Sequence, residues 1–254
     1  MIDTHCHLTD PRLGEQLDDV LERAEAAGVT RMITVGTELE DDRAAISLCR
    51  TRLNLRCAVG IHPNYTQHVQ VADVEQLCAL QDEPSVVALG EMGLDYHHQF
   101  ADRKHQASIF QAQLHLAQEV GKPVVIHCRE AVEDCLAIMA AFPNVPADFH
   151  CFTGTADEAR RILDRGYFIG YTGVVTFKNT ASVREAVKLT PMDRLLVETD
   201  APYLSPEPYR KQKVNEPALV VYTAAEVARL KGVTVEEIDR VTTENALRFF
   251  RWNG

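Results

Sequence analysis

Short apolar runs, many of them rich in β-branched residues, alternate with helical patterns along the whole chain. This alternation is typical of βα units that build a parallel sheet. We expect eight strands, over residues 1–5, 32–35, 55–58, 86–90, 124–127, 147–150, 167–170 and 195–198. Eight such units in 254 residues predict an α/β protein with a single (β/α)8 TIM-type barrel. An open doubly wound sheet is the alternative, but it favours a glycine-rich phosphate turn after the first strand, where this chain has His-Cys-His.

The segments between the predicted strands supply helices. Apolar residues recur with helical spacing from residue 17 to residue 24, and further helices are expected near 101–120 and 217–231. The last of these ends at Gly232, and Thr234 with Glu237 forms a capping box that opens another helix. No Gly/Ser linker, low-complexity segment or shift in composition marks a boundary, so we expect one domain over residues 1–254.

The charge and cysteine content limit the partners and the compartment. A net charge of -11 argues against non-specific adhesion to nucleic acid or to an anionic membrane, so any phosphate contact must be local. The seven cysteines are scattered and never spaced as Cys-x-x-Cys, which fits neither a disulfide framework nor a zinc ribbon. No apolar run reaches the roughly 18 residues of a membrane span, and Asp3 stands where a signal peptide would be hydrophobic. We therefore expect a cytoplasmic protein without a membrane contact.

Histidines and carboxylates recur where the predicted strands end. His5 and His7 lie on one face of the first strand, because side chains alternate along a strand. The carboxyl ends of barrel strands meet at one mouth, so all of these side chains are expected there. The residues that share this placement are His5, His7, Glu91, His127, His150 and Asp200.

Imidazole and carboxylate groups are the ligands expected for borderline divalent ions. Six ligands suffice for two ions if Glu91 contributes one oxygen to each. We assign His5, His7, Glu91 and Asp200 to the first ion, and Glu91, His127 and His150 to the second. The alternative is that these are ordinary core or surface histidines, which requires the same placement to arise repeatedly by coincidence. The other histidines lack strand-end placement and are expected in helices or loops, namely His68, His97, His98, His105 and His115.

With these residues in place, the chain resembles the TatD family of metal-dependent hydrolases. Six ordered segments carry the resemblance, and together they span almost the entire chain. They are Asp-Thr-His-Cys-His-Leu at 3–8, Gly-Ile-His-Pro at 60–63, Gly-Glu-Met-Gly-Leu-Asp-Tyr at 90–96, Pro-Val-Val-Ile-His-Cys-Arg-Glu-Ala at 123–131, Phe-His-Cys-Phe-Thr-Gly at 149–154 and Val-Glu-Thr-Asp-Ala-Pro-Tyr-Leu at 197–204.

The resemblance implies a metallo-dependent hydrolase barrel whose two divalent ions use the six residues above. It also implies a deoxyribonuclease, acting on single-stranded DNA or 3′ ends by 3′-5′ exonucleolytic cleavage with a metal-activated water. Nitrogen-rich ligation favours zinc or manganese, whereas a phosphate substrate favours magnesium. We expect a monomer with no obligate protein partner.

Further residues are candidates for catalysis or substrate contact. Glu91 and Asp200 are the catalytic candidates, and Asp200 can both bind metal and accept a proton from the attacking water, although a purely ligating role is the alternative. Glu198 lies deeper on the same strand face and is expected to orient a ligand or Arg129. Arg129 can grip a phosphate oxygen or pair with Glu198 or Glu130. Other candidates for substrate contact are His62, Lys178 and Arg210.

Two other functions remain open. A metal-activated water also attacks carbonyl groups, so a D-aminoacyl-tRNA deacylase or another ester or amide hydrolase is the enzymatic alternative. A non-catalytic scaffold with structural metal is the second, and the full set of six ligands argues against it.

Overall fold

The computed structural model describes residues 1–252, and its contacts divide the chain into two compact units. We call Met1–Thr34 together with the chain from Cys151 onward the outer unit, and Val35–His150 the middle unit. Each unit is described by itself. The prediction of one domain over the whole chain stays a prediction.

The outer unit contains four strands and the helices that follow them. Strand β1 pairs with β2 and β7 with β8, all in parallel, and an isolated parallel bridge joins Cys6 to Ala201 just beyond β8. The strands are β1 Ile2–Cys6, β2 Arg31–Val35, β7 Phe168–Tyr171 and β8 Leu195–Val197. The α-helices are α1 Pro11–Gly14, α2 Leu17–Ala26, α7 Ala156–Leu163, α8 Ala181–Leu189, α9 Val220–Lys231 and α10 Val235–Phe249. Short 3₁₀ turns are η3 Gly173–Thr176, η4 Met192–Arg194 and η5 Pro217–Leu219.

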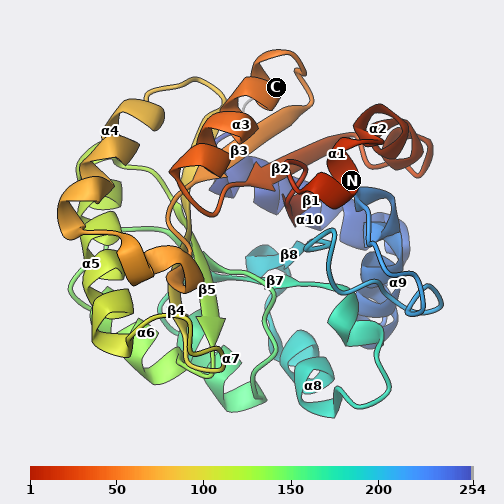
Figure 1. Cartoon of the computed structure of the whole chain (residues 1–254). Helices are drawn as coiled ribbons and strands as arrows, with labels where there is room; N and C mark the ends of the chain where they lie inside the picture. The colour runs from red at the N-terminus through yellow and green to blue at the C-terminus, as the bar shows by residue number, and fades with distance from the viewer. Residues whose placement is uncertain (253–254) are drawn as a thin grey trace. The chain divides into compact units, whose positions relative to one another are not determined.

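The middle unit contains the other four strands. They pair in parallel in the order β3, β4, β5, β6, and Figure 1 shows α4, α5 and α6 along one side of β4 and β5. The strands are β3 Leu55–Val59, β4 Val86–Asp95, β5 Val124–Arg129 and β6 Ala147–Phe149. The helices are α3 Leu39–Arg50, α4 Gln76–Leu80, α5 Arg103–Val120 and α6 Val132–Met139, with 3₁₀ turns η1 Pro63–His68 and η2 Val71–Glu75.

The eight strands follow one another in the sheet in the order of the chain, β1 to β8. This is the strand order of a (β/α)8 fold, in which every strand is followed by a crossover segment. The strands are almost entirely buried, as apolar runs covered on both faces should be. Within residues 1–252, no helix combines the length and the apolar character that a membrane crossing requires.

The bounds of these elements agree closely with those predicted from the sequence, with three differences. Strand β4 continues to Asp95 rather than ending near Gly90. Helix α5 begins at Arg103, because the Asp102 side chain accepts hydrogen bonds from two backbone N–H groups and so caps the helix. The segment predicted as one helix over 217–231 opens with the 3₁₀ turn η5 before α9. The helix end at Gly232, which has a φ of 70°, and the Thr234 cap are as predicted.

Candidate metal clusters

Each unit contains a group of side chains that could hold a metal ion. The outer cluster consists of His5, His7 and Asp200. The middle cluster consists of His62, Glu91 and His127, and His150 joins it through Glu91. These clusters include all six of the predicted ligands. We describe each cluster within its own unit.

In the outer cluster, three potential ligand atoms converge. The Nε2 atoms of His5 and His7 are 3.3 Å apart. The Oδ1 atom of Asp200 lies 3.4 Å from the His7 Nε2 and 3.9 Å from the His5 Nε2. All three residues are buried. Two imidazole nitrogens and a carboxylate oxygen form a donor set that fits a divalent ion such as zinc or manganese.

Backbone contacts fix the outer cluster. The backbone N–H of Asp200 donates to the His5 carbonyl at 2.9 Å, and that of His7 donates to the Ala201 carbonyl at 2.7 Å. Asp200 adopts a φ of 55°, a left-handed conformation that suits a short polar side chain. The loop after β8 therefore carries its carboxylate directly beside the histidines that end β1.

Two further carboxylates lie beneath the outer cluster. Asp3 accepts hydrogen bonds from the Thr199 backbone N–H at 2.9 Å and from its hydroxyl at 2.5 Å. Complete burial outweighs these bonds and raises the pKa of Asp3 to about 8. Glu198, also buried, accepts from the Thr4 hydroxyl at 3.2 Å and from the Cys151 backbone N–H at 2.5 Å. Glu198 thus braces β1, which contains His5, and its predicted role in orienting a ligand stays a prediction.

The middle cluster centres on one oxygen of Glu91. Its Oε1 atom lies 2.8 Å from the Nδ1 of His127, 2.7 Å from the Nε2 of His150 and 3.4 Å from the Nε2 of His62. Burial would raise the pKa of Glu91, but the attraction of His150 and His62 and the hydrogen bonds from His127 and His150 outweigh it. The pKa of Glu91 is therefore well below its ordinary value, and the side chain is a carboxylate.

Two glycines allow this close packing around Glu91. A Cβ atom on Gly90, which has a φ of 142°, would lie 2.6 Å from the Val125 carbonyl oxygen. A Cβ on Gly93, with a φ of 139°, would lie 2.0 Å from the His127 carbonyl oxygen. The Gly-Glu-Met-Gly segment therefore lets β4 approach β5 closely at the level of the cluster.

Asp95 is a site residue that the sequence reasoning missed. Its Oδ2 atom accepts a hydrogen bond from the Nε2 of His127 at 3.0 Å, which holds a proton on that nitrogen. Burial lowers the pKa of His127, but the hydrogen bonds to Asp95 and Glu91 outweigh it and raise the pKa, so without a metal the ring also donates from Nδ1 to Glu91. A metal ion bound at Glu91 would take the place of the Nδ1 proton, so that the Nδ1 lone pair would become the ligand. A carboxylate that holds the second nitrogen of a ligating histidine is the usual support of a metal site. The Gly-Leu-Asp-Tyr segment directly after Glu91 was the available signal.

His62 faces Glu91 with its Nε2 atom, whereas His127 faces Glu91 with Nδ1. Its Nδ1 accepts the backbone N–H of Asn64 at 3.0 Å, so the Nε2 atom carries the proton of the neutral ring. Burial lowers the pKa of His62 to about 4, against the attraction of Glu91. Near neutral pH, His62 is thus an uncharged donor toward Glu91, and its predicted role in substrate contact stays a prediction.

The predicted phosphate-binding cations are all at the surface. Arg129, at the end of β5, and Lys178 are exposed. The Arg210 guanidinium lies over the Phe177 ring at 4.2 Å from its centre. Glu130, considered as a partner of Arg129, instead lies 2.8 Å from His97 Nδ1.

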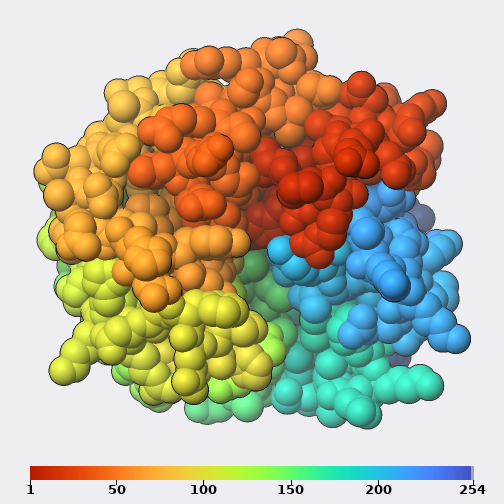
Figure 2. Space-filling view, in the orientation of Figure 1, coloured from red at the N-terminus to blue at the C-terminus, as the bar shows by residue number. Residues whose placement is uncertain are grey.

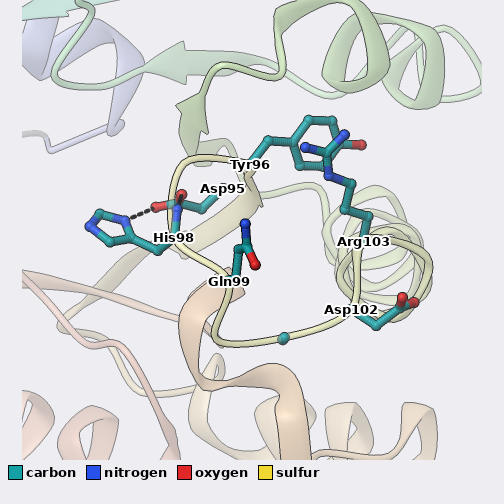
Figure 3. A pocket seen from close by; sticks show the side chains of 7 residues that line it. Asp95, Tyr96, His98, Gln99, Asp102 and Arg103 are labelled. Atoms are coloured by element: carbon teal, nitrogen blue, oxygen red, sulfur yellow. Dashed lines mark hydrogen bonds and ion pairs between the residues drawn. The ribbon is translucent and has the colours of Figure 1, made fainter.

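His97 and His98 lie in a loop, as predicted, but the prediction that they lack strand-end placement missed that this loop directly follows β4. They follow Asp95, the last residue of β4, and their backbone N–H groups donate to its Oδ1 at 3.0 and 2.8 Å. The error arose because the strand was expected to end near Gly90. His98 also contacts Asp95 through its ring, with Nδ1 2.9 Å from Oδ2, as the dashed line in Figure 3 shows.

Comparisons with known proteins agree with this fold. Residues 2–251 match the family model described as TatD related DNase. The chain is 40% identical over 255 residues to the uncharacterized metal-dependent hydrolase YabD of Bacillus subtilis, covering 100% of both chains. It is 37% identical over 257 residues to the 3′-5′ ssDNA/RNA exonuclease TatD of Erwinia tasmaniensis, covering 98% of this chain and 99% of that protein. The crystal structure of YjjV, a TatD homolog from Escherichia coli K12, superposes with a TM-score of 0.92 at 27% identity, covering 99% of this chain and 98% of that one.

The strand order and these likenesses define the class as a metal-dependent hydrolase with a (β/α)8 TIM-type barrel, and they confirm the predicted fold class. Histidine and carboxylate clusters that could hold metals are present in both units. The chain belongs to the TatD family, as its motifs indicated.

Proposed function

We propose that this chain is a metal-dependent nuclease that hydrolyses phosphodiester bonds of single-stranded DNA from the 3′ end. The observation that carries the proposal is the setting of His127, whose Nε2 is held by Asp95 while its Nδ1 faces Glu91. Such a support is found where a histidine must present one fixed lone pair to a metal ion. The relative named as a 3′-5′ ssDNA/RNA exonuclease, similar along its whole length, supports the choice of nucleic acid.

In the proposal, each cluster holds one divalent ion, Mg²⁺, Mn²⁺ or Zn²⁺. The first ion is held by His5, His7 and Asp200, and the second by Glu91, His127 and His150. A divalent ion at such a site lowers the pKa of a bound water and polarises a phosphoryl oxygen. That Glu91 serves both ions, and that both act on one phosphate, rests on the sequence prediction that strand ends of a barrel converge.

The side chains of the two clusters have separate roles in the proposed reaction. Asp200 accepts the proton of the attacking water, for which its carboxylate beside His7 is placed. Glu91 stays ionised because the surrounding histidines hold its pKa down. His62, neutral and protonated on Nε2, donates a hydrogen bond at the cluster. Arg129, Lys178 and Arg210 are the exposed cations that would meet the phosphates of the substrate.

The test is degradation of single-stranded DNA labelled at its 3′ or its 5′ end. The purified protein is chelated, then supplied with magnesium, manganese or zinc, beside an Asp200→Ala variant. We expect stepwise loss from the 3′ end that returns with metal and is absent in the variant. If no metal restores cleavage, the nuclease proposal is wrong, and ester hydrolysis on D-aminoacyl-tRNA becomes the next activity to assay.

A further inference from the structure

Two aromatic rings lie parallel and exposed in the loop between β4 and α5, residues 96–102. The rings of His98 and Phe100 are stacked, with centroids 5.5 Å apart and an interplanar angle of 7°. Phe100 is 58% exposed and the His98 side chain 48%. Figure 2 shows the yellow stretch of the chain that includes this loop at the surface. An exposed phenylalanine stacked on a half-exposed histidine leaves aromatic surface available to a third flat group.

Hydrogen bonds hold the loop in this conformation. Asp95 accepts from the backbone N–H and from the ring of His98, which fixes the imidazole at the start of the loop. The Gln106 side chain donates to the carbonyls of Asp95 and Ala101, both at 3.1 Å, and so ties the two ends of the loop together. The stacked pair is therefore preorganised, which reduces the entropy lost on binding a ligand.

A pocket opens beside the stacked pair. Its volume is about 370 Å³, at the lower end of the range for small-molecule sites. The Arg103 guanidinium lies over the Tyr96 ring at 4.0 Å, and Figure 3 shows this stack together with the Gln99 side chain. The residues that line the pocket are Asp95, Tyr96, His98, Gln99, Ala101, Asp102 and Arg103. An aromatic edge, an amide and a guanidinium are suitable partners for a heterocyclic base.

The stacked pair is joined to the middle cluster through one carboxylate. The same Oδ2 atom of Asp95 lies 2.9 Å from the His98 Nδ1 and 3.0 Å from the His127 Nε2. His127 in turn contacts Glu91 at 2.8 Å. A strand of substrate with a phosphate at the middle cluster would therefore have a neighbouring base within reach of this loop.

The charge of the protein points to stacking as the main source of affinity. The net charge of -11 gives no broad attraction for a polyanion. At the pocket, the positive charge of Arg103 is offset by Asp102, and elsewhere in the loop Glu130 lies beside His97. Proteins that hold single strands combine charge attraction to the backbone with base stacking on aromatic side chains, so a weak charge attraction leaves stacking as the larger contribution.

We propose that Phe100 and His98 form a stacking platform for an unpaired base of the nucleic acid substrate. This inference rests on the proposed nuclease function and specifies how the substrate strand is held next to the middle cluster. Its occupant is an exposed base of a single strand, since a paired base has no free face to offer.

The test compares binding and hydrolysis in a Phe100→Ala variant. Binding is measured with the metal-loaded protein and a nuclease-resistant phosphorothioate oligonucleotide that carries fluorescent 2-aminopurine near its 3′ end. We expect Phe100→Ala to weaken binding at least about fivefold and to reduce the fluorescence quenching, as the loss of one stacked base should. Phe100→Trp should restore both. The slope of affinity against salt should stay the same, because no phosphate contact is removed.

Two controls separate this inference from the proposed function. Leu53→Ala removes an 88% exposed side chain that precedes β3, at the end of the strand opposite the ligands, and should change nothing. Bis(p-nitrophenyl) phosphate contains no base, so its hydrolysis by Phe100→Ala should equal that of the wild type. If Phe100→Ala binds the oligonucleotide as tightly as Leu53→Ala does, the platform is wrong. If quenching depends on Phe100 but no phosphodiester is cleaved, the platform stands and the nuclease proposal fails.

Discussion

Asp3, beneath the outer cluster, and Glu91, at the centre of the middle cluster, are buried carboxyl groups in opposite electrostatic surroundings. In the outer unit, Asp3 is buried against the neutral hydroxyl and amide of Thr199, and its pKa rises to about 8. In the middle unit, Glu91 is just as deeply buried, yet its histidine partners bring its pKa well below the ordinary value. Burial alone therefore does not decide whether a carboxyl group is charged. Partners that can carry a positive charge do, and histidine is also a residue type that can bind metal ions.

Because their pKa values differ, the buried carboxyl groups have different roles. Glu91 and Asp95 are charged before any metal arrives, so they can attract and hold a cation without first losing a proton. Asp3 is a supporting group, since in its neutral form it fixes the segment before Asp200 by hydrogen bonds to Thr199. The predictions below test this contrast, from the largest effect to the smallest.

The largest effect is expected for Glu91→Gln. The amide cannot carry the negative charge on which three histidines converge, so metal binding at the middle cluster should be lost. Hydrolysis of single-stranded DNA should fall by more than the roughly 10–100-fold that loss of an outer partner costs. Glu119→Gln, on an exposed position of α5, is the matched control and should retain wild-type activity. Comparable activity in the two variants would remove Glu91 from the catalytic site.

A smaller effect is expected for Asp95→Asn. The Asn side chain has one oxygen instead of two, so it cannot accept all the hydrogen bonds that Asp95 accepts from the loop and from His127. The His127 ring is then no longer required to keep its proton on Nε2 and can bind it on Nδ1 instead. We expect metal affinity, measured by calorimetric titration of Mn²⁺, to fall by about 10–100-fold. Asp157→Asn, at an exposed site, is the control. Unchanged Mn²⁺ affinity in Asp95→Asn would show that Asp95 does not orient His127.

The smallest effect on hydrolysis is expected for Asp3→Asn, whose main consequence is a change in how stability depends on pH. The pKa of Asp3 is raised from 3.8 to about 8, so the folded chain binds a proton that the unfolded chain has released. Stability from this group is therefore fully present below about pH 4 and is lost as the pH rises to 8, by at most about 1.4 kcal/mol per pH unit. Urea unfolding of the chelated proteins at pH 5, 6.5 and 8 should show a steeper decline for the wild type than for Asp3→Asn. Parallel declines would mean that Asp3 is already ionised when folded.

The fold was largely readable from the sequence because each strand is a short buried apolar run. Such runs differ clearly from the helical spacing between them, and helix ends such as Gly232 and Thr234 carry specific caps. The end of strand β4 was predicted too early, because its continuation from Met92 to Asp95 contains a glycine and an acidic residue, which are uncommon in strands. The backbone pairs there nevertheless, since Gly93 permits close contact with His127.

The grouping of the candidate metal ligands was also predictable, since all of them lie in the carboxyl-terminal part of a strand or just beyond it. Asp95 and Phe100 were not, for different reasons. The role of Asp95 depends on a hydrogen bond to His127, 32 residues further along the chain, which no local pattern reveals. Phe100 would pass for an ordinary loop residue, and only its stacking on His98 and its exposure distinguish it.

The most direct test of the account is the number of metal ions that each variant binds. Chelated protein is titrated with Mn²⁺, and bound ions are counted for the wild type, Asp200→Ala and Glu91→Gln. The account predicts two ions per chain in the wild type, with the outer ion lost in Asp200→Ala and the middle one lost in Glu91→Gln. A single ion in the wild type, or an unchanged count of two in both variants, would contradict the assignment of one ion to each cluster.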